Sequence, residues 1–81
     1  MIVFRTPHFK REARSFPKYI RQALEKQVTF LVRDIRHPSL RAKKYDEERK
    51  IRQARVTEKV RFYFRIEADA YILLNIRRHT D

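Results

Sequence analysis

The chain has 81 residues, a length that predicts one domain spanning residues 1–81. It carries 21 lysines and arginines against 10 aspartates and glutamates, and the formal net charge of +11 favours polyanions or an acidic protein as partners. It has no cysteine, which excludes a disulfide framework and thiolate metal sites, and no apolar run approaches the roughly 18 residues of a membrane span. We therefore expect a cytoplasmic protein without membrane association.

The first half of the chain predicts one strand followed by two helices. The apolar run at residues 1–5 favours the strand. Thr6 and Pro7 form a typical helix start, and we expect this helix to end near Arg14. A longer helix is expected from Pro17 to about Arg36, with its apolar face formed by residues at steps of three and four: Ile20, Ala23, Leu24, Val28, Leu31, Val32 and Ile35. The two helices are expected to form an antiparallel hairpin.

The second half predicts a polar loop followed by three strands. Residues 37–50 are interpreted as the loop, with Leu40 and Tyr45 as its anchors to the body. The strands are expected at roughly Ile51–Val56, Val60–Ile66 and Ala70–Arg78, and the short connections between them favour antiparallel hairpins. The order β-α-α-β-β-β predicts an α+β domain, with the helical hairpin packed on one face of a mainly antiparallel four-stranded sheet.

The absence of glycine constrains the turns of this fold. Glycine is the residue that adopts positive φ most easily, and tight two-residue hairpin turns usually require it. We therefore expect longer hairpin turns, or Asp and Asn in left-handed conformations.

Alternation along the strands separates a core face from a second, polar face. In residues 60–66 the apolar face is Phe62, Phe64 and Ile66, and the opposite face is Arg61, Tyr63 and Arg65. In the last strand the same alternation places Ala70, Ile72, Leu74 and Ile76 on the core face, and Tyr71, Leu73, Asn75, Arg77 and His79 on the other. An uncovered face with arginines and tyrosine suits nucleic acid, because guanidinium groups bind phosphate and aromatic rings stack on bases. A solvated basic face without a ligand is the alternative.

His79 follows two arginines and is the main acid–base candidate. Histidine exchanges protons near neutral pH, and RNA cleavage through its own 2′-hydroxyl needs a base, an acid and cations. A surface histidine without a chemical role is the alternative. Histidines and carboxylates nowhere show metal-ligand spacing, and a Gly-rich phosphate loop is absent, so we expect neither metal nor cofactor.

Four stretches in order resemble the toxins of the RelE/ParE superfamily of bacterial type II toxin–antitoxin systems: HPSLRAKKYD, QARV, VRFYFRI and YILLNIRRH. The resemblance covers nearly the whole chain, including the early stretch FKREARSFPKYIRQAL. It implies a compact toxin with a concave sheet face, neutralised by a cognate, acidic antitoxin that wraps it. RelE-like members cleave mRNA in the ribosomal A site without a metal, and ParE-like members poison DNA gyrase. Operator DNA is expected as a partner only of the toxin–antitoxin complex.

The resemblance also assigns roles to individual residues. It implies that Arg55 and Arg61 hold the scissile phosphate and that His79 takes part in acid–base chemistry. The further expected nucleic-acid contacts are Arg41, Lys43, Lys44, Arg52, Tyr63 and Arg77. The expected function is that of a RelE-like, ribosome-dependent mRNA endonuclease that inhibits translation. A gyrase poison, favoured by the short segment after His79, and a non-enzymatic basic nucleic-acid-binding module are the alternatives.

Two features of the sequence bear on this assignment. Many relatives carry tryptophan where this chain has Arg52, and glycine where it has Ala68 in the last hairpin turn. The strand register also leaves two options. Pairing Val56 with Val60 places Arg55 beside Arg61, whereas a shift of one residue places Arg52 there.

Overall fold

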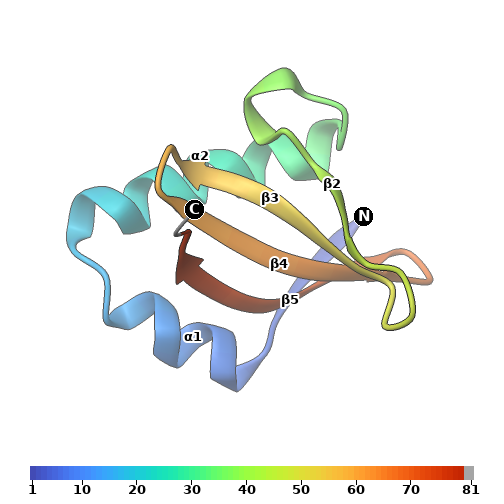
Figure 1. Cartoon of the computed structure of the whole chain (residues 1–81), viewed down its shortest axis with the longest axis horizontal. Coiled ribbons are helices and arrows are strands. Elements are labelled where there is room, and N and C mark those ends of the chain that lie inside the picture. The colour runs from blue at the N-terminus through green and yellow to red at the C-terminus, as the bar shows by residue number, and fades with distance from the viewer. Residues whose placement is uncertain (80–81) are drawn as a thin grey trace.

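The computed structural model describes residues 1–79 and shows one mixed sheet with two α-helices (Figure 1). In chain order the elements are β1 (Ile2–Arg5), α1 (Pro7–Arg14), α2 (Lys18–Arg33), the short 3₁₀ helix η1 (Pro38–Leu40), β2 (Lys43–Asp46), β3 (Ile51–Thr57), β4 (Val60–Glu67) and β5 (Ala70–Arg78). The strand order across the sheet is β1-β5-β4-β3-β2. β1 runs parallel to β5, and all other neighbours are antiparallel.

The expected α+β class and the two helices are confirmed, but the expected four strands are wrong. Lys43–Asp46, interpreted as loop, forms β2 at one edge of a five-stranded sheet. This strand is short, rich in lysine and irregular between Lys44 and Asp46. Short, charged and bulged strands are typical of sheet edges, where they discourage pairing with other chains, and such a strand carries little of the usual sequence signal.

Local sequence explains where the helices begin and end. The Thr6 hydroxyl accepts a hydrogen bond from the Phe9 backbone N–H at 3.1 Å, which caps α1 as expected. The expected end of the second helix at Arg36 is wrong, because α2 stops at Arg33. Asp34 has an extended backbone, and its carboxylate accepts a hydrogen bond from the Arg36 N–H at 2.9 Å. This local side-chain acceptor competes with a further helical turn.

The turns achieve tight geometry without glycine. Two-residue turns connect β3 to β4 and β4 to β5, so the expectation of longer hairpin turns is wrong for these two hairpins, whereas residues 47–50 form a longer turn between β2 and β3. Positive φ angles are found instead at Arg41 (46°), Lys50 (57°) and Ala68 (52°). A left-handed conformation costs a non-glycine residue about 1–2 kcal/mol, which the pairing of the flanking strands offsets at Lys50 and Ala68.

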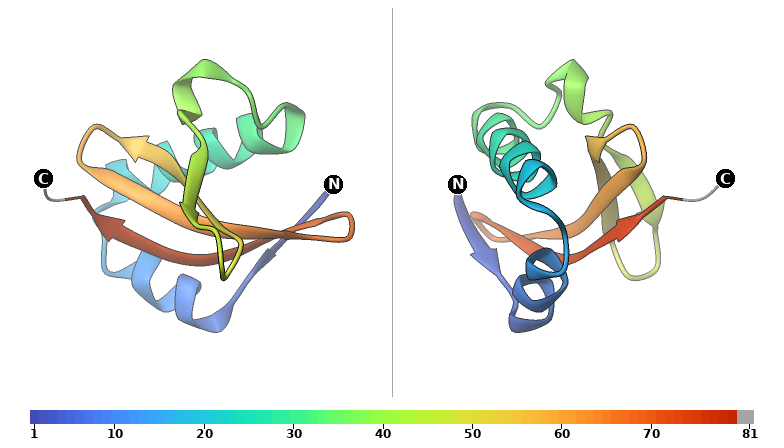
Figure 2. Two further views of the ribbon diagram at one scale, coloured as in Figure 1. Left: turned by 45° about the vertical axis from the view of Figure 1, so that its right-hand side comes forward. Right: turned by 90° about the vertical axis from the view of Figure 1, so that its left-hand side faces the viewer.

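The core lies between the sheet and α2, and α1 contributes Phe9 to it (Figure 2). Phe62 and Phe64 are fully buried, as the alternation predicts, whereas Ile66 remains 39% exposed. α2 covers one face of the sheet, and α1 lies along β5. No helix within residues 1–79 is long and apolar enough to cross a membrane.

A bulge in β5 inverts part of the expected inward face. Tyr63 pairs with Asn75, but the next residue of β4, Phe64, pairs with Leu73, so β5 contains one extra residue at this point. As a result Tyr71 and Leu73 are buried in the core, while Ile72 and Leu74 are half-buried. The alternation therefore holds from Asn75 onward and is reversed before the bulge.

Candidate functional site

Three arginines stand in adjacent positions across the uncovered face of the sheet. Arg55 in β3 pairs with Arg61 in β4, which pairs with Arg77 in β5. We call these three residues the arginine row. Directly paired residues share a face, and the neighbouring row of Ala54, Phe62 and Ile76 is buried against the helices. The arginine row therefore lies on the opposite, open face, which no element within residues 1–79 covers (Figure 2).

The strand register decides between the two options that the sequence left open. Arg55 pairs with Arg61 and Thr57 pairs with Val60, so Val56 is the extra residue of an irregularity in β3. Val56 is buried while its neighbour Arg55 lies on the open face, as strand alternation requires. Like charges on directly paired residues disfavour the folded state, and here two such pairs are adjacent. An anion that binds the row would relieve this repulsion.

The arginines of the row are held in different ways. The Arg61 Nη1 donates to the carbonyl oxygens of Thr57 and Glu58 at 2.7 and 2.8 Å, which fastens its guanidinium over the β3–β4 turn. The Arg77 Nε lies 3.5 Å from a carboxylate oxygen of Glu12. The Arg55 Nε is buried and meets no hydrogen-bond acceptor within the described residues. A buried donor without an acceptor costs about 1–3 kcal/mol, so Arg55 is the least satisfied member of the row.

Arg65 resembles Arg55 in having a buried Nε, but it lies away from the arginine row. Its Nε is also buried without an acceptor in the described part of the chain, and its Nη2 lies 3.5 Å from Glu67. Arg65 pairs with Ile72, which pairs with Phe4 of β1. It therefore stands among apolar neighbours near the other end of the open face.

Two tyrosines lie beside the arginine row. Tyr63 pairs with Gln53 and Asn75, and Gln53 pairs with Lys43, so this second row belongs to the same face. The Tyr45 ring lies 4.8 Å from the Tyr63 ring, and Tyr45 as a whole residue is 61% exposed. Burial raises the pKa of Tyr63, and Tyr45 raises it further, while Arg77 and Arg61 lower it. Tyr63 is therefore a neutral phenol at neutral pH, available as a donor or a stacking surface.

His79 extends the open face at the end of β5. Its backbone N–H donates to the Lys59 carbonyl at 2.7 Å, which continues the pairing of β4 and β5 by one residue. By alternation His79 lies on the side of Arg77. Arg78 points to the other side, where its guanidinium lies 5.3 Å from the Phe16 ring centre. The candidate acid–base group is thus at the margin of the arginine row.

The remaining expected contacts do not all share this face. Lys43, Tyr63 and Arg77 do, but Lys44 pairs with Arg52, which pairs with the buried Phe64. Lys44 and Arg52 therefore lie on the helix side of the sheet. Arg41 follows η1, outside the sheet, and lines a hollow together with residues of α2 and with Arg55 of the row. Within residues 1–79 no three histidine, aspartate or glutamate side chains are placed so that they could hold a metal ion.

Sequence reasoning missed two residues of this site, Tyr45 and Glu12. Tyr45 lies in the range interpreted as a loop, although Lys43 and Tyr45 are two residues apart, as neighbours on one face of a strand are. Glu12 connects α1 to the edge of β5, in the part of β5 that lies beyond its pairing with β1. Its Oε1 accepts hydrogen bonds from the Asn75 Nδ2 at 3.2 Å and the Ile76 backbone N–H at 3.1 Å. Its Oε2 faces the Arg77 Nε. A single carboxylate therefore accepts a backbone hydrogen bond at the edge of the sheet and positions one arginine of the row.

We expect Glu12→Ala to lower the free energy of unfolding by about 1–3 kcal/mol, because it removes the acceptor of the Ile76 N–H. Glu12→Gln keeps an acceptor oxygen and should lose less. Urea denaturation followed by circular dichroism measures both. Glu48→Ala, at an exposed turn position, is the control and should leave the transition unchanged. Equal effects of all three substitutions would show that the Glu12 contacts contribute nothing to stability.

No protein-family model and no curated protein sequence matches the chain. Its structure nevertheless superposes on a YoeB/ParE toxin from Agrobacterium tumefaciens with a TM-score of 0.82, over 99% of this chain and 100% of that one, at 12% sequence identity. The chain has the RelE/ParE toxin fold. The RelBE2 toxin–antitoxin complex of Mycobacterium tuberculosis matches at 20% identity with a TM-score of 0.77, over 96% of each chain. YafQ from E. coli also matches at a TM-score of 0.77, with 10% identity over 94% of this chain and 90% of that one.

The resemblance to RelE/ParE toxins is thus confirmed at the level of the fold. Identities of 10–20% leave few side chains in common. One fold can carry different activities, so the chemistry of the open face has to be argued from the residues of this chain.

Proposed function

We propose that this protein is the toxin of a type II toxin–antitoxin system and acts on RNA as a RelE-like, ribosome-dependent mRNA endonuclease. The observation that carries the proposal is the arginine row, with the buried Arg55 donor that lacks an acceptor among the described residues. A phosphodiester bound at the row offsets the repulsion within it, and supplies the missing acceptor once the Arg55 side chain turns its Nε toward the phosphate. The shared fold with proteins described as toxins supports the same function.

The open face offers the groups that cleavage of RNA by its own 2′-hydroxyl requires. The 2′-oxygen attacks the phosphorus, the bond to the 5′-oxygen breaks, and negative charge builds on the phosphate oxygens. Guanidinium groups fixed in advance around those oxygens stabilise this charge most effectively. We assign this role to Arg55 and Arg61, with Arg77 alongside and Lys43 contacting the RNA backbone.

We assign the other groups of the open face to contacts with the bases and to proton transfer. We assign Tyr45 and Tyr63, whose rings lie 4.8 Å apart, to stacking on bases next to the scissile phosphate. His79 is the group assigned to proton transfer, either from the attacking hydroxyl or to the leaving oxygen. The raised pKa of Tyr63 disfavours a role as base and suits hydrogen-bond donation.

A cognate antitoxin completes the proposal. With a net charge of +11, the toxin favours an acidic partner, and covering the open face would keep RNA from the arginine row. One of the structures with this fold is a toxin–antitoxin complex. Binding to operator DNA is proposed for the complex with the antitoxin, not for the free toxin.

Two reactions run side by side test this proposal. Purified protein is added to a cell-free translation reaction and to a DNA gyrase supercoiling reaction. We expect protein synthesis to stop and supercoiling to continue at its normal rate. Inhibited supercoiling with unaffected translation would assign the protein to the gyrase poisons. Unaffected rates in both reactions would indicate that the protein is a binding module without toxicity.

A further inference from the structure

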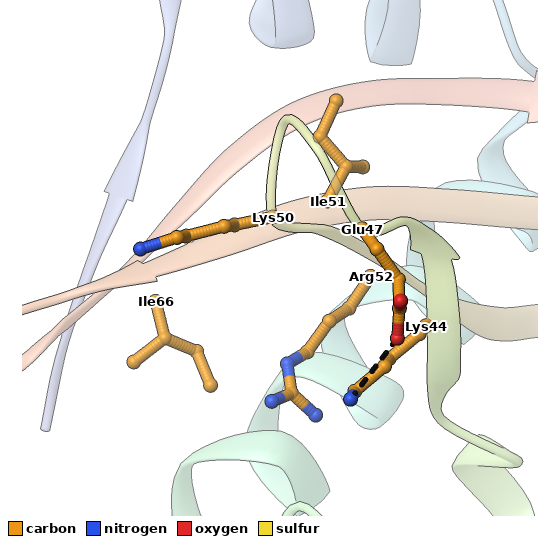
Figure 3. Close-up of a pocket in the computed structure, with 6 residues that line it drawn as sticks. All are labelled: Lys44, Glu47, Lys50, Ile51, Arg52 and Ile66. Atoms are coloured by element: carbon orange, nitrogen blue, oxygen red, sulfur yellow. Dashed lines mark ion pairs between the residues drawn. The ribbon is translucent and has the colours of Figure 1, made fainter.

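The helices leave one end of the covered face of the sheet exposed. α2 ends at Arg33, and beyond it Ile66 of β4 is 39% exposed although its strand neighbours Phe62 and Phe64 are fully buried. A groove of about 390 Å³ lies here, lined by Lys44, Glu47, Lys50, Ile51, Arg52 and Ile66 (Figure 3). We call it the β2–β4 groove.

The strand register explains how this groove is built. Lys44 pairs with Arg52, and Arg52 pairs with Phe64, so the two cations stand on the helix side. Ile66 is two residues after Phe64 in β4, so alternation places it on the same side, and Lys50, in the turn before β3, lines the groove beside it. The β2–β4 groove therefore opens on the face opposite to the arginine row.

The side chains form cationic walls around an aliphatic floor. In Figure 3 Lys44 and Arg52 lie side by side with their charged ends pointing the same way, and Lys50 extends beside Ile66. Ile51 points away from the other five residues, so Ile66 supplies the apolar surface. Three cations face one carboxylate in the lining, Glu47, which lies 3.2 Å from the Lys44 Nζ. Both partners of this pair are mostly exposed, so water screens it and an incoming carboxylate can replace it.

The composition of the groove favours a peptide over a nucleic acid. None of its six lining residues is aromatic, so the groove offers no ring for base stacking. An exposed isoleucine instead matches an aliphatic side chain, and the surrounding cations match carboxylates. The edge strand β2 borders the groove. It is bulged and rich in lysine, so the pairing of a further strand with this edge is disfavoured.

We propose that the β2–β4 groove is a docking site for an acidic protein segment with one aliphatic anchor. The anchor packs on Ile66, and the flanking carboxylates pair with Lys44, Lys50 and Arg52. Because the groove and the arginine row lie on opposite faces, such a segment binds without covering the arginine row. The proposal does not depend on RNA cleavage, because it concerns a separate surface of the folded chain.

A pair of labelled peptides tests the proposal on the full-length protein. The first has acidic residues around one central leucine, and the second has glutamine in place of the leucine. Fluorescence anisotropy should show roughly tenfold tighter binding of the leucine peptide, since its side chain loses contact with water on Ile66. Ile66→Ser should abolish the difference between the peptides and leave the weaker, charge-driven binding of both.

Charge variants and amide shifts locate the binding. Lys50→Gln should weaken both peptides, whereas Lys10→Gln, which removes the same charge from an exposed position on α1, should leave them unchanged. In the ¹⁵N spectrum the leucine peptide should shift the amides of Lys50, Arg52 and Ile66, and the dispersion of the spectrum shows that each variant is folded.

Three results would overturn the proposal. One is equal affinity for the leucine and glutamine peptides. Another is a set of peptide-induced shifts centred on Arg61 and Tyr63 of the open face. The last is a short single-stranded RNA that shifts the groove amides at lower concentration than the leucine peptide, which would assign the groove to nucleic acid. All are measured by binding, so they remain interpretable if the translation test fails.

Discussion

Replacing Arg55 with alanine is expected to lower the rate of mRNA cleavage about 100-fold or more, with the fold intact. Removing one preorganised donor to a developing oxyanion has an effect of that size in other enzymes. Arg55 is also the member of the arginine row whose buried Nε has no acceptor among residues 1–79. The rate of loss of intact mRNA in a translation reaction, measured at saturating protein, gives the effect directly.

Two variants separate phosphate binding by Arg55 from general electrostatics. Arg55→Lys restores the charge but not the forked guanidinium, so it should recover only part of the rate. Arg65→Ala removes an equal charge from the same face, and Arg65 also has a buried Nε without an acceptor in the described chain. It lies away from the row and contacts Glu67, so we expect near-normal cleavage. Equal losses from Arg55→Ala and Arg65→Ala would contradict a specific phosphate site.

Replacing Phe62 with alanine is expected to lower the free energy of unfolding by about 3–5 kcal/mol. Phe62 is fully buried, its ring lies 5.7 Å from the Phe64 ring, and its strand neighbours Arg61 and Tyr63 project from the other face. Small domains have a total stability of about 5–15 kcal/mol, so this variant would be barely folded at 37 °C in the lower part of that range. Urea denaturation measures the change.

Phe4→Ala is the matched control for this substitution. Phe4 is 53% exposed on β1, so its truncation should cost less than about 1 kcal/mol. If Phe62→Ala also cost less than that, the sheet would not be anchored on the helices through this residue. Such a result would contradict the conclusion that the buried face of β4 holds the arginine row on the open face.

Local patterns were enough to predict much of the fold. Thr6 and Pro7 fix the start of α1, and the alternation of Phe62 and Phe64 with Arg61 and Tyr63 fixes the two faces of β4. The extra residue in β5 could not be predicted, because Ile72 and Leu74 are as apolar as the residues that replace them in the core. The early end of α2 depends on one Asp34 side-chain contact that competes with otherwise good helical periodicity.

The candidate site was predictable where it depends on strand alternation and not where it depends on distant contacts. Alternation together with the family resemblance pointed to Arg55 and Arg61, and the structure pairs them directly. Glu12 could not be found, because nothing in the sequence links a residue of α1 to Arg77 near the end of the chain. Lys44 and Arg52 share the basic composition of the site, but the register turns them to the opposite face.

Mapping the ends of mRNA after translation in the presence of the protein is the most direct test of the proposed function. Primer extension on a defined message, with and without ribosomes, locates each cut. We expect new ends within codons that ribosomes occupy, no cuts when ribosomes are absent, and loss of the ends with Arg55→Ala. Intact mRNA under complete inhibition of translation would contradict an endonuclease acting through the arginine row.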